Sequence, residues 1–237
     1  MKIDGDATYI DKFGKRHLME GEATLPDETE LKILNVDGDI KFDRISCDKI
    51  KICGDCSGGS ITAEKIFVDG DVKVDATIQV VDSLKVNGDC SAESLTANKI
   101  FIDGDVKADT IKGAESLDIV GDPQVGLIES KDVVINTRSG MIEEINCDNL
   151  KIFDNSVNFE GEISFGKFRL KSYPKENFSH IRVKKILAEK VELANCKVSL
   201  IQCRDAIIGE NCSIEKLIVS GNLELNDKSK VDDIVRQ

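Results

Sequence analysis

Two cysteines, Cys53 and Cys56, form a Cys-x-x-Cys pair in this chain of 237 residues. At that spacing two thiols can reach one centre, as in a dithiol–disulfide couple or in half of a zinc site. The chain has two histidines, His17 and His180, which lie far apart in the sequence and near neither cysteine. What the cysteine pair can do therefore depends on the elements that position it.

Acidic residues directly after glycines form a second set that could do chemistry. If they stack, their carboxylates could bind a row of divalent cations, because Ca²⁺ prefers carboxylate and carbonyl oxygens. They could equally form a solvated corner, partly balanced by Lys49, Lys65 and Lys99, and we favour this second interpretation. The acidic residues are Asp6, Glu22, Asp39, Asp55, Asp71, Asp89, Asp105 and Asp122.

Known catalytic signatures do not support an enzyme. The sequence contains no Gly-x-Ser-x-Gly, no His-Glu-x-x-His and no complete phosphate-binding Gly-x-x-x-x-Gly-Lys-Ser/Thr. Residues 207–221 briefly resemble the hexapeptide pattern of left-handed β-helix acyltransferases, but the pattern fails within about two turns. We therefore expect no catalytic residue, no cofactor and no bound metal.

The glycine–acid pairs belong to a repeat of 16 to 18 residues. Two and four positions before each repeat glycine, from Gly38 onward, the residue is aliphatic, and a small or apolar residue usually lies two positions after it. This alternation has the two-residue period of a half-buried strand, and glycine followed by aspartate suits a corner. The sequence thus predicts an all-β parallel β-solenoid with coils of about 16–18 residues. The repeat glycines are Gly5, Gly21, Gly38, Gly54, Gly70, Gly88, Gly104 and Gly121.

The repeat also assigns places to the cysteines. Cys56 occupies the inward position that Val72 and Val106 occupy in later coils, whereas Cys53 lies in the turn. We interpret the Cys-x-x-Cys pair as a core position and a turn position that are adjacent by chance. With no signal peptide evident, we expect the eight cysteines to be reduced.

Composition limits the partners. The net charge of −12 argues against nucleic acid, because neutralising phosphates requires a basic surface. The chain is 41% hydrophobic with only 5% aromatic residues, so small aliphatic side chains must fill the core. The sequence has no apolar leader and no apolar run of membrane-spanning length, and we expect a cytoplasmic protein.

Three regions follow from the repeat: regular coils over 1–140, an irregular basic and aromatic segment over 141–186 that is still expected to be solenoid, and C-terminal coils with a short charged tail over 187–237. Segment 153–185 is the candidate surface for a protein partner, because seven Lys or Arg and one Glu lie between its Phe165 and Lys185. The candidate contact residues are Lys167, Phe168, Arg169, Lys171, Tyr173 and Arg182.

The coils at 66–75 and 100–109 and the segment 203–225 resemble bactofilins, the polymer-forming cytoskeletal proteins of bacteria, in particular the bactofilin-like proteins of Gram-positive bacteria. This resemblance implies a right-handed parallel β-helix that assembles end to end without nucleotide, as a scaffold in cell shape, polar organisation or motility. Its implied partners are further copies of itself and a related bactofilin. The membrane-binding N-terminal tail common in that family is not evident here, so membrane attachment is not expected.

Assembly also follows from the physics of a solenoid, because each end exposes unpaired backbone groups unless a cap covers them. We expect a non-enzymatic scaffold; the alternative is a monomeric adaptor that binds its partner through 153–185 and stays dispersed at high concentration. The candidate end-contact residues are Ile3, Tyr9 and Ile10 at one end, and Leu217, Val219, Leu223 and Leu225 at the other.

Overall fold

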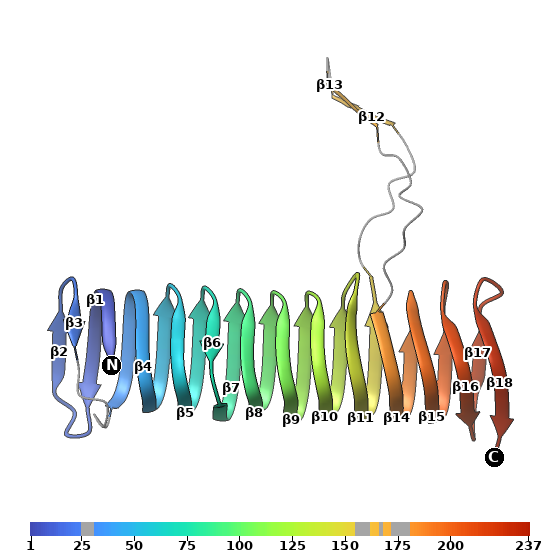
Figure 1. The fold of residues 1–237 in the computed structure, drawn as a ribbon, viewed down its shortest axis with the longest axis horizontal. Coiled ribbons are helices and arrows are strands. Elements are labelled where there is room, and N and C mark those ends of the chain that lie inside the picture. Colours follow the sequence, from blue (N-terminus) through green and yellow to red (C-terminus); the bar gives the residue numbers. More distant parts are fainter. Residues whose placement is uncertain (25–30, 155–161, 166–167, 172–180) are drawn as a thin grey trace.

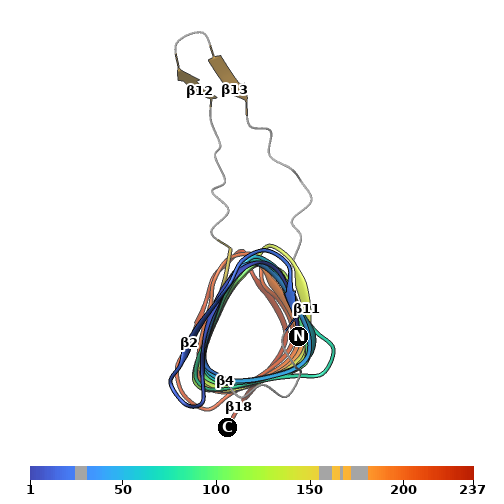
Figure 2. The same cartoon turned by 90° about the vertical axis from the view of Figure 1, so that its left-hand side faces the viewer.

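The computed structural model describes residues 1–24, 31–154, 162–165, 168–171 and 181–237. The strands stack along one long axis as the coils of a β-solenoid (Figure 1). Viewed along that axis, the coils superimpose on a roughly triangular outline (Figure 2). The predicted all-β parallel solenoid is confirmed.

Parallel pairing joins each coil to the next. The pairing path runs β4-β5-β6-β8-β9-β10-β11-β14-β15-β16-β18, with β7 paired to β5 and β8, and β17 to β15. The bounds are β4 (Leu31–Cys53), β5 (Cys56–Asp69), β6 (Val72–Val74), β7 (Thr77–Asn87), β8 (Cys90–Asp103), β9 (Val106–Val120), β10 (Pro123–Asn136), β11 (Gly140–Phe153), β14 (Ile181–Leu193), β15 (Cys196–Ile208), β16 (Ser213–Val219), β17 (Leu223–Leu225) and β18 (Lys230–Arg236).

Each coil has three sides, and each side points two alternate residues into the core. In the coil that begins after Gly38 these buried pairs are Ile40 and Phe42 on side 1, Ile45 and Cys47 on side 2, and Ile50 and Ile52 on side 3. Like positions stack, so side 2 carries an uninterrupted ladder of fully buried Ile or Leu. That ladder is Ile45, Ile61, Ile78, Leu95, Ile111, Ile128 and Ile145.

In the coils with Gly-Asp corners, glycine is required between sides 3 and 1. Gly70 has φ +150°, and a Cβ built on it would lie 2.4 Å from the carbonyl oxygen of Gly54 in the preceding coil. The same close approach recurs up the stack, where Gly88 would meet the Gly70 carbonyl oxygen at 2.4 Å. Because the coils are hydrogen-bonded at strand spacing, this corner has no room for a side chain.

The N-terminal residues depart from the expected coils. The spacing placed Gly5 and Gly21 at corners of regular parallel coils, but β1 (Lys2–Asp11) runs antiparallel to β4, with Gly5 opposite Gly38. β2 (Arg16–Met19) and β3 (Ala23–Thr24) then pair antiparallel with β1. The reversal is made by a turn in which the Asp11 carboxylate accepts the N–H groups of Phe13 and Lys15.

The segment after β11 is an insertion between two neighbouring coils. β11 pairs directly with β14, so that Gly140 lies opposite Ile181 and Ile152 opposite Leu193. Residues 141–153 and 181–186 thus belong to regular coils. β12 (Glu162–Phe165) and β13 (Phe168–Lys171) pair antiparallel with each other in a separate two-stranded sheet, drawn apart from the stack in Figures 1 and 2.

Replacing Gly70 by Ala tests the corner. We expect Gly70→Ala to lower the free energy of unfolding by about 2 to 4 kcal/mol, from the positive φ and the forced displacement of the Gly54 carbonyl. Gly21→Ala is the control: Gly21 has φ +71° but nothing within 4 Å of its added Cβ, so only the backbone strain of about 1 kcal/mol should appear. Urea unfolding measures both, and equal losses would contradict the stacking constraint.

Deleting residues 155–180 tests the insertion. The deletion joins Asp154 to Ile181 and leaves a corner of Phe153 and Asp154, which matches the corner of Ala194 and Asn195 between β14 and β15. We expect the shortened chain to keep its β-type circular dichroism and to unfold within about 1 kcal/mol of the full chain, since no solenoid strand is removed. Loss of cooperative unfolding would show that the segment is part of the solenoid core.

Candidate functional site

The stacked aspartates form a hydrogen-bonded ladder along one corner. In five successive steps the Oδ1 atom of one aspartate accepts the backbone N–H of the aspartate in the next coil, with N–O distances of 2.8–3.0 Å. The ladder runs through Asp39, Asp55, Asp71, Asp89, Asp105 and Asp122. Each carboxylate thus takes a donor that the corner would otherwise leave to water.

The lysines expected to balance this corner are engaged elsewhere. Lys65 pairs with Asp82 at 2.9 Å, and Lys99 pairs with Glu115 at 3.4 Å, at the other edge of side 3. That expectation is therefore wrong for these two lysines: the ladder uses backbone N–H groups of the next coil instead. Within the described ranges no group of three or more His, Cys, Asp or Glu side chains is arranged to hold a metal ion.

The ladder ends at Asp122, whose carboxylate accepts hydrogen bonds from Thr137 and Ser139 in place of a further aspartate. Its Oδ1 accepts the Thr137 hydroxyl at 2.9 Å and the Ser139 backbone N–H at 3.1 Å, and its Oδ2 accepts the Ser139 hydroxyl at 2.5 Å. Burial alone would raise the pKa of Asp122, but the hydrogen bonds from Ser139 and Thr137 outweigh it and lower the pKa. Asp122 is thus held ionised as the terminal acceptor of the ladder.

The cysteine pair is split between core and surface. Cys53 is exposed, whereas Cys56 is 1% exposed and lies in the ladder with Ile40 and Val72. This confirms the interpretation of the pair as a turn position and a core position. Burial raises the pKa of the Cys56 thiol to about 12, so at neutral pH it is a protonated core side chain and a poor nucleophile.

Two of the core cysteines touch. Cys196 and Cys212 occupy the same position in successive coils, and their Sγ atoms lie 3.5 Å apart. The hydrogen bond with Cys212, together with burial, raises the pKa of Cys196. Both thiols are reduced and almost fully buried, so they serve as small core side chains.

At the N-terminal end, the expected contact residues lie one layer inside the surface. Ile3 is fully buried, and Tyr9 and Ile10 are half-buried beneath β2, where Tyr9 stacks on His17 with ring centroids 4.5 Å apart. The outermost described strands at this end are β2 and β3; His17 and Met19 on β2 face the core, whereas Leu18 lies opposite Thr8 on the outer face and is 66% exposed. The antiparallel hairpin therefore covers the residues that the spacing alone had placed at the end.

At the C-terminal end, Leu217 and Val219 are fully buried because β18 stacks on them, pairing Leu217 with Ile234. Leu223 is half-buried and Leu225 is 45% exposed. The expected charged tail is therefore in part a strand, β18. Sequence reasoning missed Ile234, although the order of apolar residues in 230–235 repeats that of 213–218 one coil earlier.

This end exposes the last layer of the core. Ile234 is 42% exposed, whereas Leu217, its counterpart one coil earlier, is 0% exposed. Leu225 is 45% exposed, and its counterpart Ile208 is 1% exposed. Among the described strands, β18 pairs only with β16 and β17 only with β15, so the outer edges of both strands are open.

The candidate partner residues are only partly described. Lys167 and Tyr173 lie outside the described residues, and Phe168, Arg169 and Lys171 belong to β13. Arg182 is instead an exposed residue of β14 on side 1 of the solenoid, stacked between Met141 and Lys197. The structure thus assigns Arg182 and β13 to different sheets.

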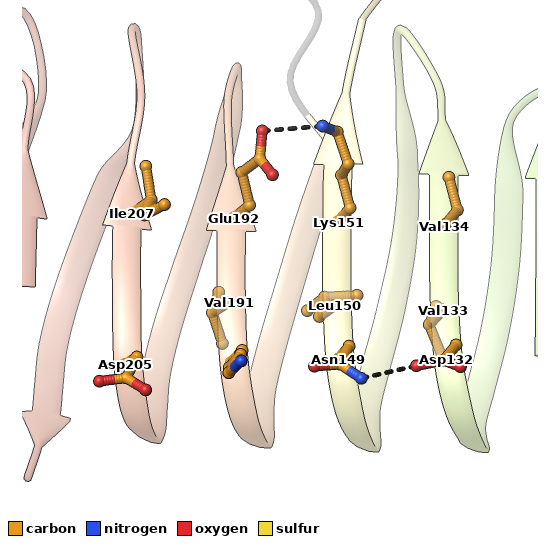
Figure 3. Close-up of a pocket in the computed structure, with 11 residues that line it drawn as sticks. Asp132, Val133, Val134, Asn149, Leu150, Lys151, Val191, Glu192, Asp205 and Ile207 are labelled. Carbon is orange, nitrogen blue, oxygen red and sulfur yellow. Dashed lines mark hydrogen bonds and ion pairs between the residues drawn. The ribbon is translucent and has the colours of Figure 1, made fainter. Parts of the chain in front are cut away.

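The groove in Figure 3 runs along side 3 in the C-terminal half. Val134, Lys151, Glu192 and Ile207 stack along it, and Lys151 pairs with Glu192 at 2.9 Å. The groove is lined by a mixture of short aliphatic and paired charged side chains, with neither a histidine nor a cysteine among them. Ile207 remains 47% exposed there, an apolar residue on a side and not at an end.

Comparison of the chain with protein-family models, curated proteins and solved structures found no match. Within the described residues, no helix is long and apolar enough to cross a bilayer.

Asp122→Ala tests the end of the ladder. We expect the free energy of unfolding to fall by about 1 to 3 kcal/mol, because the buried Thr137 hydroxyl and the Ser139 N–H lose their acceptor. Asp109→Ala, at an exposed aspartate outside the ladder, should change it by less than about 0.5 kcal/mol.

The pH dependence has a definite sign. A lowered pKa stabilises the fold above the ordinary value of 3.8, and this contribution is lost as the pH falls through the lower folded value. The difference between wild type and Asp122→Ala should therefore shrink below about pH 3.8 in urea unfolding. A difference that grows with acid would contradict the assignment.

Proposed function

We propose that this protein is a structural scaffold that assembles end to end into filaments. The observation that carries the proposal is the open last layer of the core, where Leu225 and Ile234 are about half exposed while their counterparts one coil earlier are buried. A further stacked coil would remove them from water and pair the outer edges of β17 and β18.

The opposite end supports the same proposal. The inward-facing residues of β2, His17 and Met19, are only partly buried, and β2 and β3 are the outermost described strands at this end. Both run antiparallel to β1, which itself runs antiparallel to β4, so they point in the direction of the coil strands. A C-terminal end brought to an N-terminal end would therefore continue the parallel stacking of the solenoid. Contacts between unlike ends do not close and so propagate an open filament.

The resemblance of the repeats to bactofilins agrees with this proposal and suggests a cytoskeletal role in a bacterial cytoplasm. Nothing in the described residues calls for a nucleotide: the stacking is made by strand edges and apolar side chains. A related chain with the same coil period could join the same stack.

A partner-binding adaptor is the second candidate, and the direct pairing of β11 with β14 favours a separate role for the inserted segment. Residues 155–180 are not needed to close the coil, so they are available to bind a protein. An adaptor would keep its solenoid but lose its partner when the segment is deleted, and it would remain dispersed at high concentration.

Charges at the open end should stop assembly. We expect Leu225→Lys with Ile234→Lys to raise the concentration needed for assembly at least about tenfold, because burying each half-exposed side chain contributes roughly 1 kcal/mol and an ammonium at the junction opposes contact. Ile207→Lys is the control, since Ile207 is 47% exposed on a side and not at an end. Pelleting by ultracentrifugation across a concentration series measures the three proteins. If the double variant pellets like wild type, the C-terminal end is not the junction.

A further inference from the structure

Side 3 of the N-terminal half carries two nearly identical surface rows. In β5 the residues Lys65, Phe67 and Asp69 point outward, while Ile66 and Val68 between them are buried. In β8 the outward residues are Lys99, Phe101 and Asp103, again separated by buried isoleucines. We call these the two Lys–Phe–Asp rows.

The two rows are held in register by the row between them. Phe67 pairs with Lys85, and Lys85 pairs with Phe101. The Lys85 Nζ atom lies 5.7 Å from the centroid of the Phe67 ring and 5.2 Å from that of Phe101. Both phenylalanines are half-exposed, so two aromatic side chains stand on the surface about 9.6 Å apart, at two strand spacings.

Each row has a positive end, an aromatic centre and a negative end. A two-fold axis parallel to the solenoid, lying in the plane of this face, reverses the order across the strand and keeps the direction of the stack. It places Lys65 of one copy opposite Asp69 of another, and Phe67 opposite its own copy. A two-fold axis across the stack would instead bring lysine onto lysine and aspartate onto aspartate, which is unfavourable.

We propose that side 3 of the N-terminal half is a self-complementary contact surface at which a second copy of this chain docks side by side, with the two solenoids parallel. We assign a second copy as the occupant because this face carries both the positive and the negative end of each row and is therefore complementary to itself. This side-by-side contact is separate from the proposed end-to-end contact. Only its strengthening by repetition along a filament rests on the proposed function.

The balance of charges favours the contact. The two rows form four ion pairs between copies, two through Lys65 and Asp69 and two through Lys99 and Asp103. In the row between them Lys85 meets its own copy, and in the row before them Lys51 does the same, which gives two like-charge contacts. Lys65 and Lys99 already pair with Asp82 and Glu115, but an ammonium has three donors and can serve a second carboxylate.

The size of the surface predicts a weak contact between single copies. Four rows at about 4.8 Å and five residues at about 3.3 Å cover on the order of 300 Å² per copy, against about 800 Å² per partner in a stable complex. Filaments would repeat the contact once per subunit, which converts a weak pairing into firm bundling. Exposed ion pairs also make it sensitive to salt.

The C-terminal half of the same side does not carry this pattern. There the position of the row lysines is held by Asp132, Asn149, Lys190 and Asp205, and the aromatic position by Val134, Lys151, Glu192 and Ile207, so the one lysine has no aromatic residue beside it (Figure 3). Side 1 has exposed lysines, among them Lys73 and Lys107, but these stand beside the Asp ladder without an aromatic neighbour in their column. The two Lys–Phe–Asp rows are therefore a local feature, and Lys73 and Lys107 offer matched control positions.

Carbodiimide cross-linking tests the contact directly, because it joins a lysine amine to a carboxylate only where the two touch. A concentrated mixture of ¹⁴N- and ¹⁵N-labelled full-length protein at low salt should yield mixed-isotope peptides that join Lys65 to Asp69 and Lys99 to Asp103. Within one chain these partners are four residues apart on a strand, about 13 Å, and cannot be joined. The intramolecular Lys65–Asp82 link is the internal positive control.

Charge exchange sharpens the test. Lys65→Glu with Lys99→Glu should lose the mixed-isotope links at least tenfold, and so should Asp69→Lys with Asp103→Lys, whereas a mixture of the two variants should restore links between them. Lys73→Glu with Lys107→Glu changes the charge equally and should keep the links. Absence of mixed-isotope links in wild type, or their equal loss in the control, would overturn the proposal. Pelleting separates this from end-to-end assembly: the Lys65→Glu, Lys99→Glu variant should still pellet as filaments while losing its lateral links, whereas wild-type filaments without lateral links would refute only the side contact.

Discussion

Hydrogen bonding between successive coils is the constraint on which the rest of this molecule depends. It holds each residue over its counterpart at strand spacing, so the residue at a given position must fit against the residue at the same position in the next coil. At the corner after side 3 in the coils from Gly54 to Gly121 that condition admits only glycine, because the carbonyl of the previous glycine occupies the place of a Cβ. The same stacking turns a potential column of repelling aspartates into a ladder, in which each carboxylate accepts the next N–H. Backbone geometry therefore requires the glycines, and the aspartates beside them are tolerated because each carboxylate is hydrogen-bonded to the next coil.

The regular part of the fold could be predicted from the sequence because its cause is local and repeated. Alternating aliphatic residues and the Gly-Asp corners carry the coil period, and they placed Cys56 in the core correctly. The structure of the first coil could not be predicted in this way. Gly21 keeps the repeat spacing, yet the turn at Asp11 reverses the chain, and antiparallel pairing of β1 with β4 satisfies the same backbone groups.

Other features depend on what lies in the neighbouring coil. Phe42 fits inside side 1 because Gly58 above it has no side chain, and a Cβ there would come within 2.4 Å of the ring. A periodic pattern cannot show such compensation between different positions. The last strand, β18, was hidden for a related reason. Its inward residues are framed by charges, and only its pairing with β16 reveals that Ile234 stacks on Leu217. The end of the solenoid therefore lies one layer further out than the sequence indicated, and so does the proposed junction.

The central claim is that the stack continues from one copy into the next, and a cryo-electron microscopy reconstruction of wild-type assemblies tests it most directly. The account requires a filament in which the strand spacing of about 4.8 Å runs without a break across the subunit boundary, with Leu225 and Ile234 buried there. Particles that remain single at every concentration, or polymers joined only through the sides of the solenoid, would contradict it.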